Sequence, residues 1–316
     1  MIIGTWRIRT VGVRIRHLAT IMLGPGGRPR VPGVPPVLRA TPLTDPILGH
    51  GEGPVWHDGV FRCVDMLAGD VVTLADDGSV RRDHVGDVAA ALRPRVGGGW
   101  VVATEREFVL LDADFRPEWS SGPLWSQDDI RFNEGGADPD GAFLCGSMAY
   151  DERSGAGTLY RLRPDRTVEV VEEGLSIPNG LAFADDGTAL HVDTPTHRID
   201  RITLHDGRTA ERRPVVTIED GVGHPDGLTP DAAGGFWVAL FTGGAVRHYT
   251  ADGVLDAVVE VPASQTTACA LGGTRLYVTT SARDIDPDDE PLAGAVFVAE
   301  VGDVSAPGAP VRPYGG

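Results

Sequence analysis

A sequence unit that recurs six times at intervals of roughly 45 residues is the feature that most restricts the fold of this chain. In each copy a glycine-containing turn precedes a short run of β-forming residues. The copies align at Phe61, Trp100, Phe143, Ala189, Phe236 and Arg275, with successive spacings of 39, 43, 46, 47 and 39 residues. This spacing is typical of β-propeller blades, which hold four strands each.

The fourth copy shows the unit most clearly. We expect strands near residues 181–184, 189–193, 199–204 and 214–218, separated by turn sequences such as Asp206-Gly207. No long amphipathic helical pattern appears after residue 45, so the strand-helix alternation of an α/β fold is absent. The sequence therefore predicts an all-β protein, a six-bladed β-propeller with four-stranded blades.

We expect one propeller domain over residues 36–316, closed by pairing of residues 36–43 with the strands near residues 295–301. Residues 1–35 form an Arg-rich extension, and the first 44 residues contain seven Arg but no Asp or Glu. Two explanations stay open: a transit-like leader, which lacks the apolar core of a secretory signal, or an over-long start with Met22 as the initiator. Either way, we predict that residues 1–35 are not part of the fold.

Charge and cysteine content exclude several classes of function. The 28 basic residues, all of them Arg, stand against 45 acidic residues and give a net charge of −17, which argues against binding to nucleic acid or anionic membranes. No apolar run is long enough to span a membrane. Cys63, Cys145 and Cys269 are odd in number and far apart, so we expect buried thiols, no disulfide framework and a cytoplasmic location.

A carboxylate or carboxamide beside a glycine precedes four of the six aligned runs at an almost constant distance. Glu52, Asn133, Asn179 and Asp226 lie nine or ten residues before the aligned positions. Each dipeptide alone is typical of a tight turn. However, residues at one phase of a propeller repeat lie at one height, and Asn179 and Asp226 lie in near-copies 47 residues apart. We therefore expect the four side chains to converge on the central axis.

Two carboxylates and amide oxygens without thiolates suit a hard divalent cation that keeps open positions for water and substrate. A cation also allows two converging carboxylates to stay ionised despite their repulsion. The sequence leaves calcium, zinc, manganese, magnesium and iron open. His50 and His224 each lie two residues before a proposed ligand, on the same strand face, and their roles stay open between proton transfer and packing.

Several ordered motifs resemble the gluconolactonase, regucalcin and senescence-marker-protein (SMP-30) family of six-bladed propellers. The resemblance runs from about Gly51 to the end of the chain. The motifs are Gly51-Glu52-Gly53-Pro54, Arg131-Phe132-Asn133-Glu134-Gly135, Gly146-Ser147-Met148-Ala149, Ser176-Ile177-Pro178-Asn179-Gly180-Leu181, Asp193-Thr194-Pro195-Thr196, Pro225-Asp226-Gly227 and Tyr277-Val278-Thr279-Thr280-Ser281-Ala282-Arg283.

The resemblance implies one divalent metal held by Glu52, Asn179 and Asp226, with Arg131 and Asn133 reaching substrate hydroxyls. It also points to Asp151 as the nearest match to a further substrate-binding acid that follows the Gly-Ser-Met-Ala motif. Two departures put the identity of the lactone in question. Glu134 stands where many relatives carry Asp, and Tyr150 stands where an acid is usual.

The expected function is metal-dependent hydrolysis of a small-molecule sugar lactone, such as glucono-1,5-lactone, xylonolactone or arabinonolactone, to the aldonic acid. The metal would polarise the carbonyl while Asp226 accepts a proton from the attacking water. The chain has no Gly-x-Ser-x-Gly nucleophile motif. Two alternatives stay open: a broader lactonase or arylesterase of paraoxonase type, and a non-catalytic calcium-binding or protein-interaction propeller. The oligomeric state stays open as well.

Overall fold

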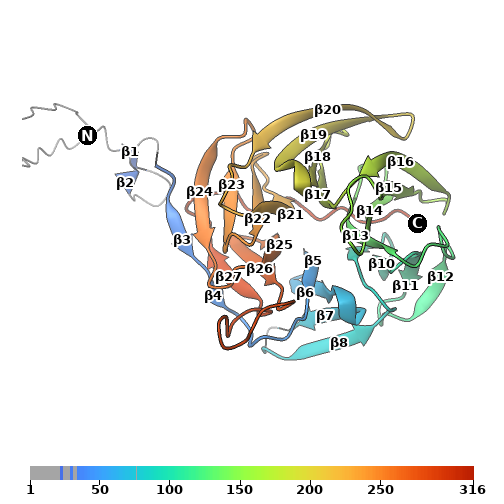
Figure 1. Cartoon of the computed structure of the whole chain (residues 1–316), viewed down its shortest axis with the longest axis horizontal. Coiled ribbons are helices and arrows are strands. Elements are labelled where there is room, and N and C mark those ends of the chain that lie inside the picture. Colours follow the sequence, from blue (N-terminus) through green and yellow to red (C-terminus); the bar gives the residue numbers. More distant parts are fainter. Residues whose placement is uncertain (1–21, 24–28, 31–33, 76) are drawn as a thin grey trace, which may run out of the picture.

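The computed structural model describes residues 22–23, 29–30, 34–75 and 77–316, and the regular secondary structure of this part of the chain consists almost entirely of strands. Six sheets stand in a ring with their first strands around the centre (Figure 1). This arrangement confirms the predicted six-bladed β-propeller. Within the described ranges, no helix is long and apolar enough to cross a membrane.

Each blade begins at the centre and adds its strands outward in chain order. Blade one contains β5 (Gly51–His57), β6 (Val60–Asp65), β7 (Asp70–Leu74) and β8 (Val80–His84). Blade two contains β9 (Ala91–Pro94), β10 (Trp100–Ala103), β11 (Phe108–Leu111) and β12 (Pro117–Ser120). Blade three contains β13 (Ile130–Ala137), β14 (Phe143–Ala149), β15 (Gly157–Leu162) and β16 (Val168–Leu175).

The second half of the ring repeats this order. Blade four contains β17 (Pro178–Phe183), β18 (Ala189–Asp193), β19 (Arg198–His205) and β20 (Arg208–Thr217). Blade five contains β21 (His224–Pro230), β22 (Phe236–Phe241), β23 (Ala245–Tyr249) and β24 (Leu255–Glu260), and blade six contains β25 (Thr266–Gly272), β26 (Arg275–Thr280) and β27 (Phe297–Glu300). Short 3-10 turns occur at η2 (Met66–Ala68) and η3 (Thr194–Thr196). The six aligned positions of the repeat therefore fall at or beside the start of each blade's second strand.

The segment before blade one closes the ring, although only part of it pairs as predicted. β4 (Thr41–Pro42) lies antiparallel to β27 and becomes the outer strand of blade six. β3 (Val37–Arg39) instead runs parallel to β24 and gives blade five a fifth strand. β1 (Met22–Leu23) and β2 (Pro29–Arg30) pair with each other. Apart from these two strands and residues 34–35, the predicted extension over residues 1–35 lies outside the described residues.

Buried apolar side chains fill the interfaces between neighbouring blades and form five clusters around the ring. Both faces of a blade are therefore covered, which explains nearly continuous apolar strands such as β22, Phe236–Phe241. Cys63, Cys145 and Cys269 are buried in these interfaces as free thiols, as the sequence predicts.

The segment after β27 crosses one end of the ring and ties five blades together. Its backbone N–H groups donate to carbonyls of four blades: Gly308 to blade six, Ala309 to blade five, Tyr314 to blade two and Gly315 to blade three. The side chain of Arg312 donates to a carbonyl of blade four. The acceptors lie where the innermost strands end. Figure 1 shows this segment passing behind the ring to the C-terminus, so it covers the end opposite the starts of the innermost strands.

Candidate active site

A cavity of about 530 Å³ opens where the innermost strands begin. Five of the six candidate site residues line it. They are Glu52 of β5, Arg131 and Asn133 of β13, Asn179 of β17 and Asp226 of β21. Each of these five residues is at most 5% exposed. The shared phase of the repeat therefore corresponds to one converging set of polar side chains in space.

Asp151 lies outside this cavity, in contrast to its expected place beside the substrate. β14 ends at Ala149, and the chain then turns, with the N–H of Glu152 donating to the carbonyl of Ala149. The turn directs Asp151 to the surface, where its side chain is 64% exposed and pairs with Arg153 at 2.8 Å. Glu152, the next residue, lines the cavity instead.

The Asn-Gly and Asp-Gly pairs lie inside strands rather than in tight turns. A shift in strand register occurs at each site position, between Glu52 and Val55 in β5, Asn179 and Leu181 in β17, and Pro225 and Leu228 in β21. Such bulges leave residues unpaired and re-aim their side chains. The local backbone thereby frees the polar side chains to face the cavity.

The glycines after Asn179 and Asp226 allow the innermost strands to approach each other closely. A Cβ at Gly180 would lie 2.7 Å from the carbonyl oxygen of Asp226, and one at Gly227 would lie 2.3 Å from Cβ of Ala268. These distances are shorter than any ordinary carbon contact. Only glycine therefore fits where the strands of neighbouring blades converge at the axis.

A chain of hydrogen bonds fixes the amide groups of the site. Arg131 Nη1 donates to Asn133 Oδ1 at 2.7 Å, and Asn133 Nδ2 donates to Asn179 Oδ1 at 2.9 Å. Asn179 Nδ2 donates to Thr194 Oγ1 at 2.8 Å, and that hydroxyl donates to the carbonyl of Pro225 at 2.9 Å. The bonds to Asn133 and Thr194 fix the orientation of the Asn179 amide, and its oxygen, which accepts one hydrogen bond, has one lone pair left for a ligand.

Three buried carboxyl groups belong to this cluster. Burial raises the pKa of Glu52 well above its usual range, and the charges of Asp226 and Glu134 raise it further. Burial likewise raises the pKa of Asp226, again with a contribution from Glu134. Burial also raises the pKa of Glu134, while the charge of Arg93 opposes this shift. Without a compensating cation, the three carboxylates therefore oppose one another's ionisation.

Glu134 was not among the candidate site residues of the sequence, although it follows Asn133 directly. In a regular strand, consecutive side chains point to opposite faces. Here the register of β13 shifts between Phe132 and Gly135, so both Asn133 and Glu134 lie in the bulge. Both are buried. The sequence signals for Glu134 are its place directly after Asn133 and its membership of the motif of residues 131–135.

The donor set fits a hard divalent cation. Asp226 Oδ1 is fully buried and has no hydrogen-bond partner among the described residues. An orphaned carboxylate oxygen beside Glu52 and Asn179 is what a cation needs as a ligand. Among the described residues, no three His, Cys, Asp or Glu side chains are arranged to hold a metal by themselves.

Histidines surround the mouth of the cavity. His50 Nδ1 and Ser281 Oγ share a hydrogen bond of 2.9 Å. Burial, followed by the charges of Arg131 and Arg283, lowers the pKa of His50 to about 3. His50 is therefore neutral at pH 7. His224 also lines the cavity and packs edge-on against His197, with ring centres 4.7 Å apart.

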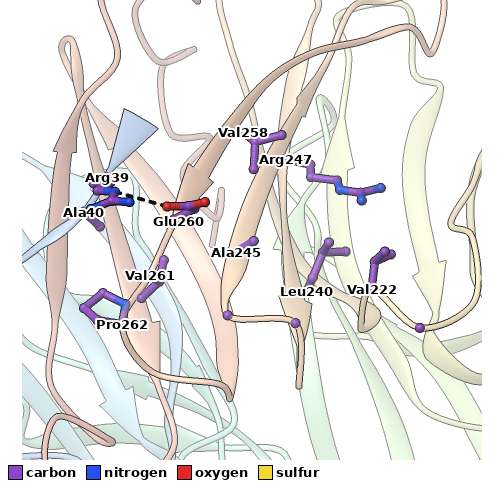
Figure 2. Close-up of a pocket in the computed structure, with 13 residues that line it drawn as sticks. Arg39, Ala40, Val222, Leu240, Ala245, Arg247, Val258, Glu260, Val261 and Pro262 are labelled. Carbon is purple, nitrogen blue, oxygen red and sulfur yellow. Dashed lines mark hydrogen bonds and ion pairs between the residues drawn. The ribbon is translucent and has the colours of Figure 1, made fainter. Parts of the chain in front are cut away.

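A second hollow, of about 690 Å³, lies on the flank of blade five beside β3 (Figure 2). Apolar side chains such as Val222, Leu240 and Val258 line it. Its charged residues are neutralised, because Arg39 pairs with Glu260 and Arg247 pairs with Glu219. Despite its larger volume, this hollow lacks the converging polar groups of the central cavity and is not the candidate active site.

The fold and the cavity together define a class of protein: a six-bladed propeller with a carboxylate-rich site at one end of its axis. The chain belongs to the SMP-30/Gluconolactonase/LRE-like family, whose model matches residues 50–282. It is 33% identical over 265 residues to 6-deoxy-6-sulfogluconolactonase of Pseudomonas putida, with 79% of this chain and 91% of that protein covered.

Other relatives agree with this assignment. Pentonolactonase XacC of Haloferax volcanii is 33% identical over 295 residues, with 86% of this chain and 97% of that protein covered. The crystal structure of a calcium-binding protein, regucalcin from Agrobacterium tumefaciens, superposes with a TM-score of 0.80 at 26% identity, covering 88% of this chain and 99% of the other.

Proposed function

We propose that this protein is a metal-dependent sugar lactonase that hydrolyses an aldonolactone to the aldonic acid. The observation that carries the proposal is the buried cluster of Glu52, Asn179 and Asp226, in which one carboxylate oxygen of Asp226 has no partner among the described residues. The two lactonase names among the relatives support the same reaction class.

In this proposal Glu52, Asn179 and Asp226 hold the cation. A divalent cation in such a site supplies Lewis-acid polarisation of a carbonyl and stabilises the negative charge that develops on its oxygen. Asn179 is held for this task by its hydrogen bonds to Asn133 and Thr194. Hydrogen-bond partners of this kind fix the orientation of a metal-binding side chain and raise the affinity of the site for the metal.

Asp226 is the proposed general base. Its carboxylate accepts a proton from water as the water oxygen attacks the lactone carbonyl carbon. The bond between that carbon and the ring oxygen then breaks, and the ring oxygen takes up the proton to become a hydroxyl of the open acid. Arg131 and Asn133 are proposed to hold ring hydroxyls, and Arg131 Nε is a buried donor with no partner among the described residues.

The character of the cavity supports a sugar lactone as the substrate class. Its walls offer amide, guanidinium and carboxylate groups, which suit a polyol ring better than an aryl ester. We propose glucono-1,5-lactone, xylonolactone and arabinonolactone as the substrates to compare. The choice of metal among calcium, zinc, manganese, magnesium and iron belongs to the same experiment.

The test follows proton release at neutral pH from freshly dissolved lactones, with the spontaneous rate subtracted. Chelator-treated protein is compared with protein resupplied with each cation. We expect a metal to restore turnover, Asp226→Ala to abolish it, and Asp151→Ala to retain it, because Asp151 is an exposed carboxylate outside the cavity.

Background rates with every lactone and cation would overturn the proposal. If phenyl acetate were then hydrolysed, the paraoxonase-type alternative would stand. If cations bound in calorimetry without any hydrolysis, a non-catalytic calcium-binding propeller would be the better description.

A further inference from the structure

Blade six contributes the polar side chain of Gln265 to the cavity, and this side chain has no role in the reaction described above. Gln265 lies ten residues before Arg275, the same offset that separates Asn133, Asn179 and Asp226 from their own aligned positions. It lines the cavity. Its Oε1 atom is fully buried and has no hydrogen-bond partner among the described residues.

Although Gln265 has the same sequence offset as Asp226, the strand register places it nearer the mouth of the cavity, so here equal offset does not mean equal height. Gln265 directly precedes β25, and its carbonyl accepts a hydrogen bond from the N–H of Ser281 at 3.0 Å. Asp226, in contrast, lies within β21, beyond the pairs that His224 and Pro225 make with β22. The Gln265 carboxamide therefore lies above the carboxylate cluster, toward the substrate's side of the site.

The ring geometry places Gln265 across from the proposed substrate clamp. In a ring of six blades, blade six faces blade three, which carries Arg131 and Asn133. Arg283 lines the same wall as Gln265. The charge of Arg283 lowers the pKa of both Arg131 and His50, although burial is the larger cause in each case. Residues of both walls line the same cavity of about 530 Å³, so one bound molecule can contact both.

We propose that Gln265 accepts a hydrogen bond from a substrate hydroxyl remote from the reacting carbonyl, and so determines which sugar lactone is preferred. A buried acceptor without a partner is unfavourable, and a bound hydroxyl donor satisfies it. In this proposal the lactone carbonyl lies at Glu52, Asn179 and Asp226, and the hydroxyl that Gln265 accepts from is that of the exocyclic hydroxymethyl group. This inference rests on the proposed lactonase function.

Two lactones that differ only in this group test the inference. Glucono-1,5-lactone carries the exocyclic hydroxymethyl group, and xylono-1,5-lactone lacks it. The wild type should prefer the first in kcat/KM, and Gln265→Leu should reduce this preference by about 3- to 10-fold, the effect of one uncharged hydrogen bond. Gln127→Leu is the matched control, because Gln127 is exposed and lies outside the cavity.

Calorimetry provides a second readout that does not need turnover. The cation-loaded protein is titrated with 1,5-anhydroglucitol and with 1,5-anhydroxylitol, cyclic polyols that cannot be hydrolysed. Gln265→Leu should weaken binding of the first by about 3- to 10-fold and leave the second unchanged.

The outcomes separate this inference from the proposed function. If the wild type hydrolyses lactones but a folded Gln265→Leu variant keeps both the substrate preference and the polyol affinity, the role of Gln265 is overturned and the lactonase proposal stands. If no lactone is hydrolysed, the lactonase proposal fails, and the polyol titration still decides whether Gln265 binds a hydroxyl.

Discussion

Replacing Asp226 by Asn should stabilise the metal-free protein and at the same time remove its response to metal. Asp226 is 5% exposed, and one of its carboxylate oxygens has no partner among the described residues. A buried unsatisfied group costs about 1–3 kcal/mol. Asparagine has the same shape, carries no charge and offers N–H groups to the neighbouring carboxylates, so the metal-free variant should recover a comparable free energy of unfolding.

The expected shifts in melting temperature follow from this free energy. For domains of about 150–250 residues, 1 kcal/mol corresponds to about 2–4 °C, and this longer chain should lie near the lower value. Asp226→Asn should therefore raise Tm by about 2–6 °C in chelator. A cation at 100 times its Kd stabilises the wild type by about 2.7 kcal/mol, or about 5 °C, and should have almost no effect on the variant.

Differential scanning calorimetry at pH 8, with chelator and with an excess of the cation that restores turnover, measures both shifts. Asp151→Asn serves as the control, because it removes an exposed carboxylate and should leave both values unchanged. The reasoning fails if Asp226→Asn melts below the wild type in chelator. It also fails if that cation stabilises the variant as much as the wild type.

Three further predictions concern other parts of the molecule. Thr194→Val should weaken cation binding in calorimetry by about 10-fold, because it removes the acceptor that holds Asn179, while Thr194→Ser should bind normally. Burial would lower the pKa of His248, but its hydrogen bonds to Asp231 and Asp256 prevail and raise it to about 9. The protonated form of His248 thus contributes at most about 3 kcal/mol of stability, which is fully present below pH 6.5 and lost as the pH rises through 9. Asp256→Asn should reduce the fall in Tm over this pH range. Tyr314→Ala should cost about 3 kcal/mol in denaturant unfolding and spare kcat, because this fully buried side chain lies at the end of the ring opposite the cavity, whereas Tyr314→Phe should lose only about 1 kcal/mol.

Much of the fold could be predicted from the sequence because the repeat is local information. Turn residues and β-forming runs recur at each blade, so the second strands of all six blades could be placed from the aligned positions. Closure near Thr41–Pro42 could also be predicted. The parallel pairing of β3 with blade five could not, because a short edge segment carries no signal for which neighbouring sheet it joins.

The level of the candidate site along the propeller axis could be predicted from the sequence, but the set of side chains that line it could not. A constant offset from the aligned positions selects Glu52, Asn179 and Asp226, since equivalent residues of a repeat lie at one level. It does not decide which side chains face the axis, because a bulge changes the alternation of a strand. The bulge in β13 is how Glu134 joined the carboxylates. Asp151 was directed to the surface by a separate feature, the turn after β14.

The sequence by itself determined the number of blades, their register along the chain and the residue types at one phase of the repeat. Only the tertiary structure decided which of those residues meet. Ring closure sets blade six opposite blade three and so brings Gln265 across from Arg131, although 134 residues separate them in the chain. The physical reason is that turn and strand preferences act over a few residues, whereas the contents of the cavity depend on where the packed blades place distant side chains.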